Sequence, residues 1–320
     1  MSVPDVSEQT VEALRGRDFL TIHDYAPAEV AALLELAGEL KARQKRGETN
    51  RPLAGKAVGM IFMKTSTRTR ISFEVGIAQL GAQPLFLSAN DIQLRVGETI
   101  KDTGHVLSRY LDAIMIRTFA QDDVVDLAAN ASIPIINGLT DDHHPCQGMA
   151  DALTVKEHFG SLKGRTLVYS GDGNNVAHSL AEVGAKTGMR IVICTPDEYR
   201  PNEAIVARAR ADAAATGASI ELTNDLRGAV KGADVIYTDT FTSMGQEAEH
   251  DTRLAALRAY QLNTGLLELA GPQARVMHCL PAHWGEEITE EALYSPQSVV
   301  FDQAENRLHA QKAIMAALIG

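Results

Sequence analysis

The sequence predicts an α/β protein of two domains, each with a mostly parallel sheet flanked by helices. Short apolar runs alternate with longer helical patterns along almost the whole chain, which is typical of parallel sheets. The length of 320 residues suits two domains, because a domain usually has roughly 100–200 residues. Hydrophobic residues make up 45% of the chain and charged residues 22%, a composition that indicates a soluble globular protein.

The first half of the chain contains four candidate strands. Each is a short apolar run bounded by polar or turn-forming residues, as expected of a buried strand. Amphipathic patterns between the runs predict helices that end at Leu80, cover about 99–109 and cover about 121–131. The predicted strands are residues 56–63, 83–88, 112–118 and 133–137.

Turn-forming residues interrupt the alternation at 137–147, and we place the domain border just beyond them. The first domain is predicted to cover 1–149 and the second 150–303, joined by a helix at about 148–159. The amphipathic helix at about 304–320 is expected to pack back on the first domain. The second domain has six candidate strands, residues 164–170, 189–195, 218–222, 233–239, 274–280 and 298–302.

The net charge narrows the choice of partners. The chain has 30 Lys and Arg against 41 Asp and Glu, a formal charge of −11 at pH 7. Such an acidic surface argues against nucleic acid or a membrane as partner, and an anionic substrate would need a local cluster of arginines.

The sequence also bears on where the protein works. No window approaches the roughly 18 apolar residues of a membrane-spanning helix. The first residues lack a signal-peptide pattern, and three scattered cysteines give no disulfide framework. We therefore expect a cytoplasmic protein.

The polar segment after the first strand has the composition of an anion site. In parallel sheets, ligands bind where the carboxyl ends of strands meet loops. Residues 64–70 read Lys-Thr-Ser-Thr-Arg-Thr-Arg and open a helix, whose free backbone N–H groups attract anions. Arginine suits phosphate because its planar fork donates two parallel hydrogen bonds. The Walker pattern is absent, so a nucleoside triphosphate is not expected. The structural alternative is a capped helix with exposed arginines.

Further polar groups at strand ends suit a carbonyl. Arg117 directly follows an apolar run, and Gln93 lies in the loop after residues 83–88. The segment His143-His144-Pro145-Cys146-Gln147 offers an imidazole and an amide that can polarise a carbonyl oxygen. Zinc would need about four N or S ligands in a recognisable spacing, so no metal is expected here. The alternative is a polar loop held by its proline.

The Gly171-Asp-Gly-Asn-Asn175 turn lies between a strand and a helix, as a dinucleotide-binding fingerprint does. Its third glycine is missing, since Val176 and Ala177 follow, and Cys194-Thr195 stand where an acidic ribose ligand belongs. We interpret the turn as presenting Asn175 to a ligand, with a purely structural turn as the alternative. A nicotinamide-dependent oxidoreductase is the other enzyme class that it would support.

Two strand ends in the second half carry a carboxylate and a thiol. Asp239 ends the strand at 233–239 and precedes the Ser243-Met244-Gly245 loop, an arrangement that suits recognition of a cationic amine. Cys279, near the end of the strand at 274–280, could be a nucleophile, a proton acceptor or an inert buried thiol. Residue type alone leaves these three roles open.

Together these segments resemble the aspartate/ornithine carbamoyltransferase family over nearly the whole chain. The first two motifs below are shared across that family, whereas the Ser-Met-Gly loop and the His-Cys-Leu-Pro segment are similar to its members that act on ornithine. The motifs are Ser66-Thr-Arg-Thr-Arg70 with Ser72-Phe-Glu74, His144-Pro-Cys-Gln147, Asp239 with Ser243-Met-Gly245, His278-Cys-Leu-Pro281, and Glu305-Asn-Arg307.

The resemblance implies transfer of the carbamoyl group from carbamoyl phosphate to the δ-amine of L-ornithine, giving L-citrulline and phosphate in arginine metabolism. It also implies a homotrimer or a multiple of trimers. The residues implied for carbamoyl phosphate are Ser66, Thr67, Arg68, Thr69, Gln93, Arg117, His144, Pro145, Cys146, Gln147, Cys279, Leu280 and Arg307. Those implied for ornithine are Asn175, Asp239, Ser243 and Met244. Those implied for the chemistry are Arg68, Arg117, His144 and Cys279.

The chemistry agrees with these residue types. Negative charge grows on the carbonyl oxygen as the amine attacks, and arginines with an imidazole can stabilise it. The phosphate leaves as an anion paired with guanidinium groups, so no cofactor and no metal are expected. The δ-amine has a pKa near that of lysine, about 10.4, and must first lose a proton. Cys279 is the candidate acceptor of that proton.

The chain departs from the family pattern at two loops. Met63 stands where many members have Glu, and Arg95-Val96 where many have Gly and then a basic residue. These changes affect the detail around Gln93 rather than the reaction. Trp284, the single tryptophan, either covers the site or packs.

Two alternatives keep the fold and change the function. One is a carbamoyltransferase with another acceptor, namely an acylated ornithine, putrescine or aspartate. Asp239 favours a free α-amino group, because an acylated amine carries no charge to pair with it. The other is a non-catalytic relative that binds anions as a sensor, but no reactive residue is missing.

Overall fold

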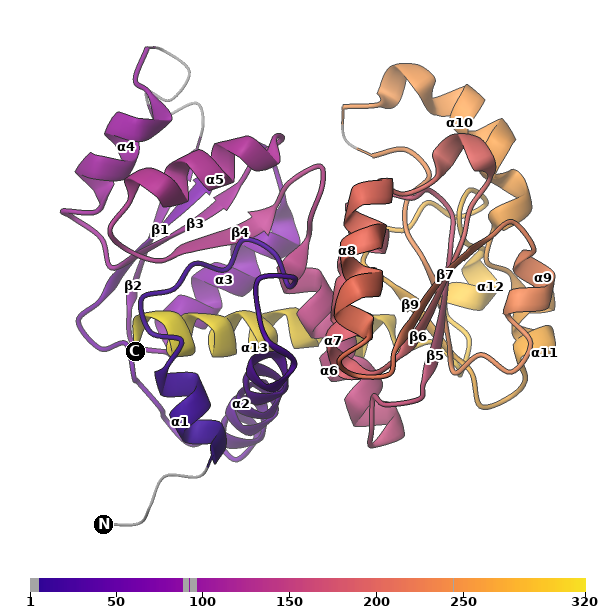
Figure 1. The fold of residues 1–320 in the computed structure, drawn as a ribbon, viewed down its shortest axis with the longest axis horizontal. Helices are drawn as coiled ribbons and strands as arrows, with labels where there is room; N and C mark the ends of the chain where they lie inside the picture. Colours follow the sequence, from indigo (N-terminus) through magenta and orange to yellow (C-terminus); the bar gives the residue numbers. More distant parts are fainter. Residues whose placement is uncertain (1–5, 89–91, 93–96, 244) are drawn as a thin grey trace. The chain divides into compact units, whose positions relative to one another are not determined.

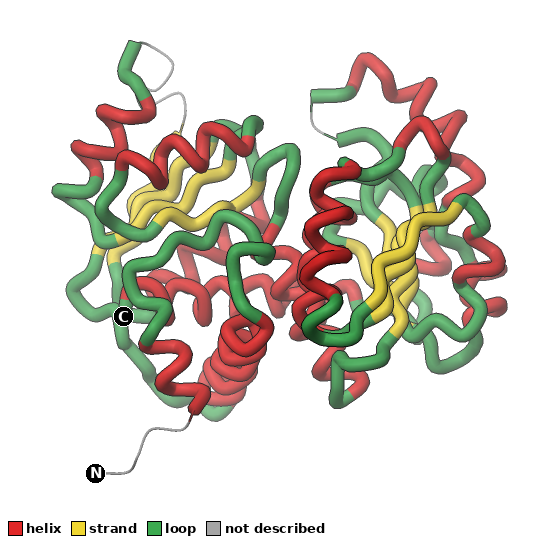
Figure 2. The backbone as a smooth tube through the Cα atoms, in the orientation of Figure 1, coloured by secondary structure: helices red, strands yellow, loops and turns green. Residues whose placement is uncertain are grey.

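The computed structural model describes residues 6–88, 92, 97–243 and 245–320 (Figure 1). The chain divides into two compact units, Met1–Leu153 with Asn306–Gly320, and Thr154–Glu305. The borders between the units fall inside two helices, α6 Pro145–Phe159 and α13 Val300–Ile319. Each unit contains one parallel sheet flanked by helices, which confirms the predicted fold class (Figure 2). The resemblance implies that the first domain, 1–149, binds carbamoyl phosphate and the second, 150–303, binds ornithine, and this assignment stays a prediction.

The sheet of the first unit has the strand order β2-β1-β3-β4, and all neighbouring strands are parallel. Alternate residues of a strand point to opposite faces. On one face, Ile61, Ile114 and Ile135 form a buried cluster with side chains of α5 Gln121–Asn130, and residues of α4 Ile100–Leu107 pack against it. The strands are β1 Ala57–Phe62, β2 Gln83–Ser88, β3 Ala113–Arg117 and β4 Ile135–Leu139.

The C-terminal part of α13 packs within the first unit, between two of its helices. Lys312 Nζ donates to Gln44 Oε1 and Gln79 Oε1, both at 2.9 Å. Gln44 lies in α2 Pro27–Lys45, and Gln79 is the last residue of α3 Thr67–Gln79. Two helices before residue 56, α2 and the short α1 Val6–Glu12, are not among the elements predicted from the sequence. Pro27 begins α2, since a fixed φ suits the first helical position.

The sheet of the second unit has the order β7-β6-β5-β8-β9, again with parallel neighbours. Leu167 and Tyr169 face the cluster formed with α7 and α8, whereas Val168 between them faces the cluster formed with α9 to α12. The strands are β5 Thr166–Ser170, β6 Arg190–Cys194, β7 Ser219–Thr223, β8 Val235–Thr238 and β9 Arg275–His278. The helices are α7 Asn175–Thr187, α8 Glu203–Ala213, α9 Leu226–Ala229, α10 His250–Leu257, α11 Thr264–Ala270 and α12 Glu290–Leu293.

One predicted strand is wrong. Residues 298–302 do not form a strand, because α13 begins at Val300, and Ser298 contributes an isolated bridge to Val276. The apolar pair Val299-Val300 is too short for periodicity to separate a strand from a buried helix. These residues form the start of a helix because the helical pattern continues for 20 residues. The other nine predicted strands each overlap an observed strand.

Packing accounts for the glycine-rich turn after β5. Gly173 N donates to Tyr199 O at 2.8 Å, and a Cβ on Gly173 would lie 2.2 Å from Pro201 N. No real Cβ approaches backbone so closely, so only glycine fits. The second glycine of the turn is therefore required by the neighbouring backbone, without any dinucleotide. Among the helices in the described ranges, none has the length and apolar character to cross a membrane.

Candidate active site

The first half-site lies at the carboxyl edge of the sheet in the first unit. Phe62 of β1 pairs with Arg117 of β3, and Met63 N donates to Arg117 O at 2.8 Å. This pairing brings the loop that follows β1 beside Arg117, as the parallel sheet requires. The site residues predicted for this unit that the structure describes here are Ser66, Thr67, Arg68, Thr69, Arg117, His144, Gln147 and Arg307.

The start of α3 has the features of an anion-binding helix terminus. Ser66 is the N-cap, and its Oγ accepts from Thr69 N at 3.2 Å. The first turn of a helix offers backbone N–H groups and the positive end of the helix dipole. Thr67 is exposed and Arg68 is half-buried, so both can reach a ligand at this helix start. The arrangement suits a phosphate group.

A buried hydrogen-bond chain ties three helices of the first unit together behind this helix start. Arg307 of α13 donates through Nη2 to Thr69 Oγ1 at 3.3 Å and through Nη1 to Gln147 Oε1 at 2.7 Å. Gln147 in turn donates to Asp151 Oδ1 at 2.8 Å. All four residues are almost fully buried. Residues far apart in sequence therefore form one polar network.

Lys64, the first residue of the polar loop, is directed elsewhere. Its ammonium group pairs with Asp141 and lies 4.2 Å from the centre of the Phe119 ring. The lysine side chain is buried. Its charge therefore stabilises the loops that follow β3 and β4 rather than a ligand at the start of α3.

His144 is a buried imidazole among positive charges. Burial lowers the pKa of His144 well below its usual value, and the charges of Arg307 and Arg117 lower it further. A neutral imidazole can donate one hydrogen bond to a carbonyl oxygen. The neighbouring Cys146 is inert, since burial raises the pKa of its thiol to about 12 and its Sγ donates to Asn137 O at 3.4 Å.

We expect His144 to remain neutral at pH 6.5, where an ordinary imidazole is about half protonated. Its folded-state pKa lies below the unfolded-state value, so the unfolded chain binds the extra proton first as the pH falls through about 6.5. His144 therefore lowers the free energy of unfolding below that pH. An NMR titration of the His144 ring measures this protonation. A titration of His144 near pH 6.5 would contradict the assignment.

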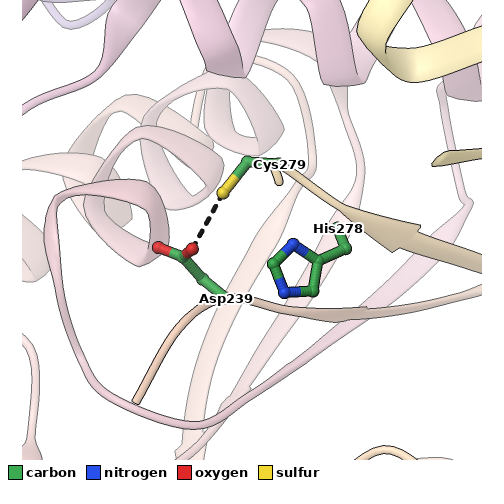
Figure 3. A group of neighbouring side chains, drawn as sticks. All are labelled: Asp239, His278 and Cys279. Atoms are coloured by element: carbon green, nitrogen blue, oxygen red, sulfur yellow. Dashed lines mark hydrogen bonds between the residues drawn. The ribbon is translucent and has the colours of Figure 1, made fainter. Parts of the chain in front are cut away.

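The second half-site lies at the carboxyl edge of the sheet in the second unit. Thr238 of β8 pairs with His278 of β9, so the residues after them are neighbours. Cys279 Sγ donates to Asp239 Oδ1 at 2.8 Å, and Figure 3 shows the thiol pointing at the carboxylate with the His278 ring beside them. The structure thus brings together the carboxylate and the thiol that the sequence analysis singled out.

The other oxygen of Asp239 is held by Asn174. Asn174 Nδ2 donates to Asp239 Oδ2 at 2.7 Å, while Asn174 Oδ1 caps α7 by accepting from the backbone N–H groups of Val176 and Ala177. Asn175, the residue predicted from the sequence, is the next one along the chain and is partly exposed as the first residue of α7. The position of an N-cap, directly before a helix, was the signal that could have identified Asn174.

A second pair behind Cys279 was also missed. His278 Nδ1 accepts from Leu280 N at 2.8 Å, so the ring proton lies on Nε2, which donates to Glu287 Oε1 at 3.0 Å. Leu280 has a φ of 59°, a left-handed conformation that is strained for a branched side chain. The His278 bond holds this turn, so it positions Cys279.

The second half-site is rich in acidic groups. Burial raises the pKa of Asp172 to about 6, Arg253 opposes this rise, and the charge of Asp239 adds to it. Arg253 pairs with Asp172 and donates through Nε to Phe241 O at 2.7 Å. Arg253 therefore links the segment after Asp239 to the turn before α7 through its contacts with Phe241 and Asp172.

Some predicted site residues take other positions or lie outside the described residues. Gln93 and Met244 are outside them. Ser243 is partly exposed, and its N–H donates to Gln246 Oε1 at 3.1 Å. Pro145 is the first residue of α6. Trp284 is 55% exposed and packs edge-on against Tyr294, with ring centres 5.9 Å apart.

In the described ranges, two groups of three side chains have the atom types of metal ligands, and the Asp239–Cys279 pair with His278 is one of them. The potential ligand atoms of Asp239, His278 and Cys279 lie within 4.8 Å of one another. Both nitrogens of His278 are occupied, by Leu280 N–H and by Glu287. Two donors remain, which is fewer than a zinc site uses.

Comparisons with known proteins cover both units. A family model described as aspartate/ornithine carbamoyltransferase, carbamoyl-P binding domain, matches residues 17–157. A second, described as aspartate/ornithine carbamoyltransferase, Asp/Orn binding domain, matches residues 163–318. Together the two matches span almost the whole chain.

Similar proteins and solved structures agree with these matches. The ornithine carbamoyltransferase of Symbiobacterium thermophilum is 56% identical over 96% of this chain and 99% of its own length. A protein of Pyrococcus furiosus named ornithine carbamoyltransferase, anabolic, is 53% identical over 97% of this chain and 98% of its own. The solved structure of ornithine carbamoyltransferase from Pyrococcus furiosus superposes with a TM-score of 0.93, at 53% identity over 96% of this chain and 98% of that one.

Proposed function

This chain belongs to the aspartate/ornithine carbamoyltransferase family, and we propose that it acts as an ornithine carbamoyltransferase. The reaction moves the carbamoyl group of carbamoyl phosphate to the δ-amine of L-ornithine and gives L-citrulline and phosphate. Both half-sites support this assignment, since one is rich in arginines and the other in carboxylates.

The observation that carries the proposal is the hydrogen bond between Cys279 and Asp239 at the ends of two adjacent strands. A carboxylate in a fixed position is complementary to a primary ammonium group, and ornithine presents such a group at its α-carbon. Asn174 and the backbone N–H of Thr240 also donate to this carboxylate. An acceptor with a free α-amino group therefore fits the second half-site.

The first half-site supplies groups for carbamoyl phosphate. Ser66, Thr67, Arg68 and Thr69 would hold the phosphate at the start of α3. Arg117 and the neutral His144, with Gln147, Arg307 and Gln93, would surround the carbonyl oxygen, where negative charge grows during attack. Donors that are already oriented need no reorganisation in the transition state. The leaving phosphate is stabilised by the same guanidinium and N–H groups that bind it.

The second half-site supplies groups for ornithine and its proton. Asn175, Asp239, Ser243 and Met244 would bind the amino acid, and Cys279 with Leu280 would lie beside the δ-amine. The Cys279 thiol is the donor in its bond to Asp239, so it would accept a proton from the δ-amine only as a thiolate, after its own proton has left to solvent. Asp239 would stay ionised and pair with the α-ammonium group.

Three further features of the proposal come from the resemblance. The chain assembles as a homotrimer, which light scattering after size-exclusion chromatography measures. It works in the cytoplasm, with no nucleic acid and no membrane as partner. It serves arginine biosynthesis, as the word anabolic in the name of the Pyrococcus furiosus relative suggests for that protein.

The acceptor assay tests the proposed function. Colorimetric detection of the carbamoylated product should give a kcat/KM for L-ornithine that exceeds those for N-acetylornithine, N-succinylornithine, putrescine and aspartate by more than about 100-fold. A site built to pair with a polar group discriminates strongly against analogues that lack it. A comparable or higher value for any of the other acceptors would replace ornithine as the substrate.

A further inference from the structure

A tight turn downstream of Cys279 gathers a second group of ligand-type side chains, which neither the sequence analysis nor the proposed function uses. His283, Glu286 and Glu287 each contribute an atom, and these atoms lie within 4.8 Å of one another. The turn is closed by Glu286 N donating to His283 O at 3.1 Å and by Gly285 N donating to Ile288 O at 3.0 Å. The backbone therefore holds the three side chains together.

Glu287 is the buried member of this group, and its two oxygens differ. Its side chain has 0% exposure. Oε1 accepts from His278 Nε2 at 3.0 Å and from His283 N at 2.5 Å. Oε2 is also buried and finds no hydrogen-bond donor among the described residues. A buried carboxylate oxygen without a partner is rare and calls for an explanation.

The distance from this oxygen to the nearest imidazole suits a shared ion. Glu287 Oε2 lies 3.7 Å from His283 Nδ1, which is longer than a hydrogen bond. Zinc binds carboxylate oxygen and imidazole nitrogen at about 2.0–2.2 Å in a tetrahedral arrangement, which puts two ligands about 3.3–3.6 Å apart. The observed separation is close to that of two ligands of one ion.

The remaining groups are accessible to solvent. The side chain of His283 is 48% exposed and that of Glu286 is 26% exposed. His250 is a fourth candidate ligand, since its Nε2 lies 3.6 Å from Glu286 Oε1. A cation can therefore enter from solvent and keep water in any remaining position.

We propose that His283, Glu286 and Glu287 form a binding site for a divalent transition metal of the zinc class, with His250 as the candidate fourth ligand. An imidazole with two carboxylates favours such ions over calcium or magnesium, which prefer oxygen ligands throughout. The ion would satisfy the buried oxygen of Glu287. Glu287 also holds His278, so the bound ion would stabilise the turn that positions Cys279. The inference does not depend on the proposed reaction.

The test uses the metal-free, full-length protein carrying Cys279→Ser, so that a thiol cannot bind the ion. Calorimetric titration with Zn²⁺ should show one site, and Zn²⁺ should raise the melting temperature. His283→Asn and Glu286→Gln should each weaken Zn²⁺ binding by at least about 10-fold, the size of effect seen when the ligand shell of a metal site is damaged. Both side chains are partly exposed, so the variants should fold.

His158→Asn is the matched control, because His158 also lies beside a single carboxylate, Asp302, at 2.9 Å. It should leave the Zn²⁺ affinity unchanged. Co²⁺ bound to the Cys279→Ser protein should show ligand-field absorption that the additional change His283→Asn removes. Equal Zn²⁺ affinity with and without His283, or absence of binding, would overturn the proposal.

Discussion

Replacing Arg68 with alanine should lower kcat about 10²–10³-fold, because a fixed donor to developing charge is lost. Arg68 lies in the first turn of α3, where the Ser66 cap leaves backbone N–H groups open to an anion. The phosphate gains negative charge as its bond to the carbamoyl carbon breaks, and the guanidinium stabilises that charge. Steady-state kinetics should also show a higher KM for carbamoyl phosphate and little change in the KM for ornithine.

Arg68→Lys and Arg70→Ala are the matched controls for this prediction. Lysine keeps the charge but not the planar fork, so Arg68→Lys should retain more activity than Arg68→Ala and remain below the parent enzyme. Arg70 lies on the same helix, where it pairs with Glu74 at 3.4 Å and covers the ring of Phe86. Arg70→Ala should therefore lower kcat much less than Arg68→Ala does. Parent-like kinetics of Arg68→Ala would reject the phosphate assignment.

The strand ends were predictable because the parallel sheets follow from local patterns. Apolar runs such as 57–62 are buried on both faces, so they are continuous and easy to find. Once the sheets are parallel, the polar loops after β1, β3, β8 and β9 must lie at carboxyl edges. The strand expected at 298–302 was wrong because its few apolar residues belong to the first turn of a long helix.

The contacts inside the site were beyond sequence reasoning because they are tertiary. Arg307 meets Gln147 across 160 residues, and no local pattern relates the two. Glu287 meets His278 through a turn whose conformation depends on Leu280. The choice of Asn175 over Asn174 depended on which residue begins α7, and element boundaries are the least certain part of a sequence prediction.

The two half-sites differ in charge in the way that the two substrates require. Burial, with the charges of Arg307 and Arg117, lowers the pKa of His144 and keeps it neutral in the first unit, and two positive charges suit an anionic phosphate. Asp172 and Asp239 lie close enough in the second unit for one charge to raise the pKa of the other carboxyl, which suits a cationic amino acid. We therefore expect a chain with a net charge of −11 to bind an anion through a local arginine cluster.

Asp239→Asn should reduce kcat/KM for ornithine on the order of 100-fold or more, because a charge-assisted bond is lost and a buried partner is left unpaired. The amide can still accept from one donor, so the fold should survive. The binding of carbamoyl phosphate alone, measured by calorimetry, should change by less than about threefold, because all the charged groups assigned to that ligand belong to the first unit. The effect should therefore fall on one substrate.

Asp302→Asn provides the control, since Asp302 is an exposed carboxylate of the same unit beside His158. Asp302→Asn should leave kcat/KM for ornithine and the affinity for carbamoyl phosphate at the parent values.

Cys279→Ser should reduce turnover but preserve ornithine binding better than Asp239→Asn does. Serine can still donate to Asp239, but it is a poorer proton acceptor than a thiolate. Equal weakening of carbamoyl phosphate binding and ornithine binding by Asp239→Asn would show that this carboxylate does not select the amino acid. The acceptor site would then have to lie elsewhere.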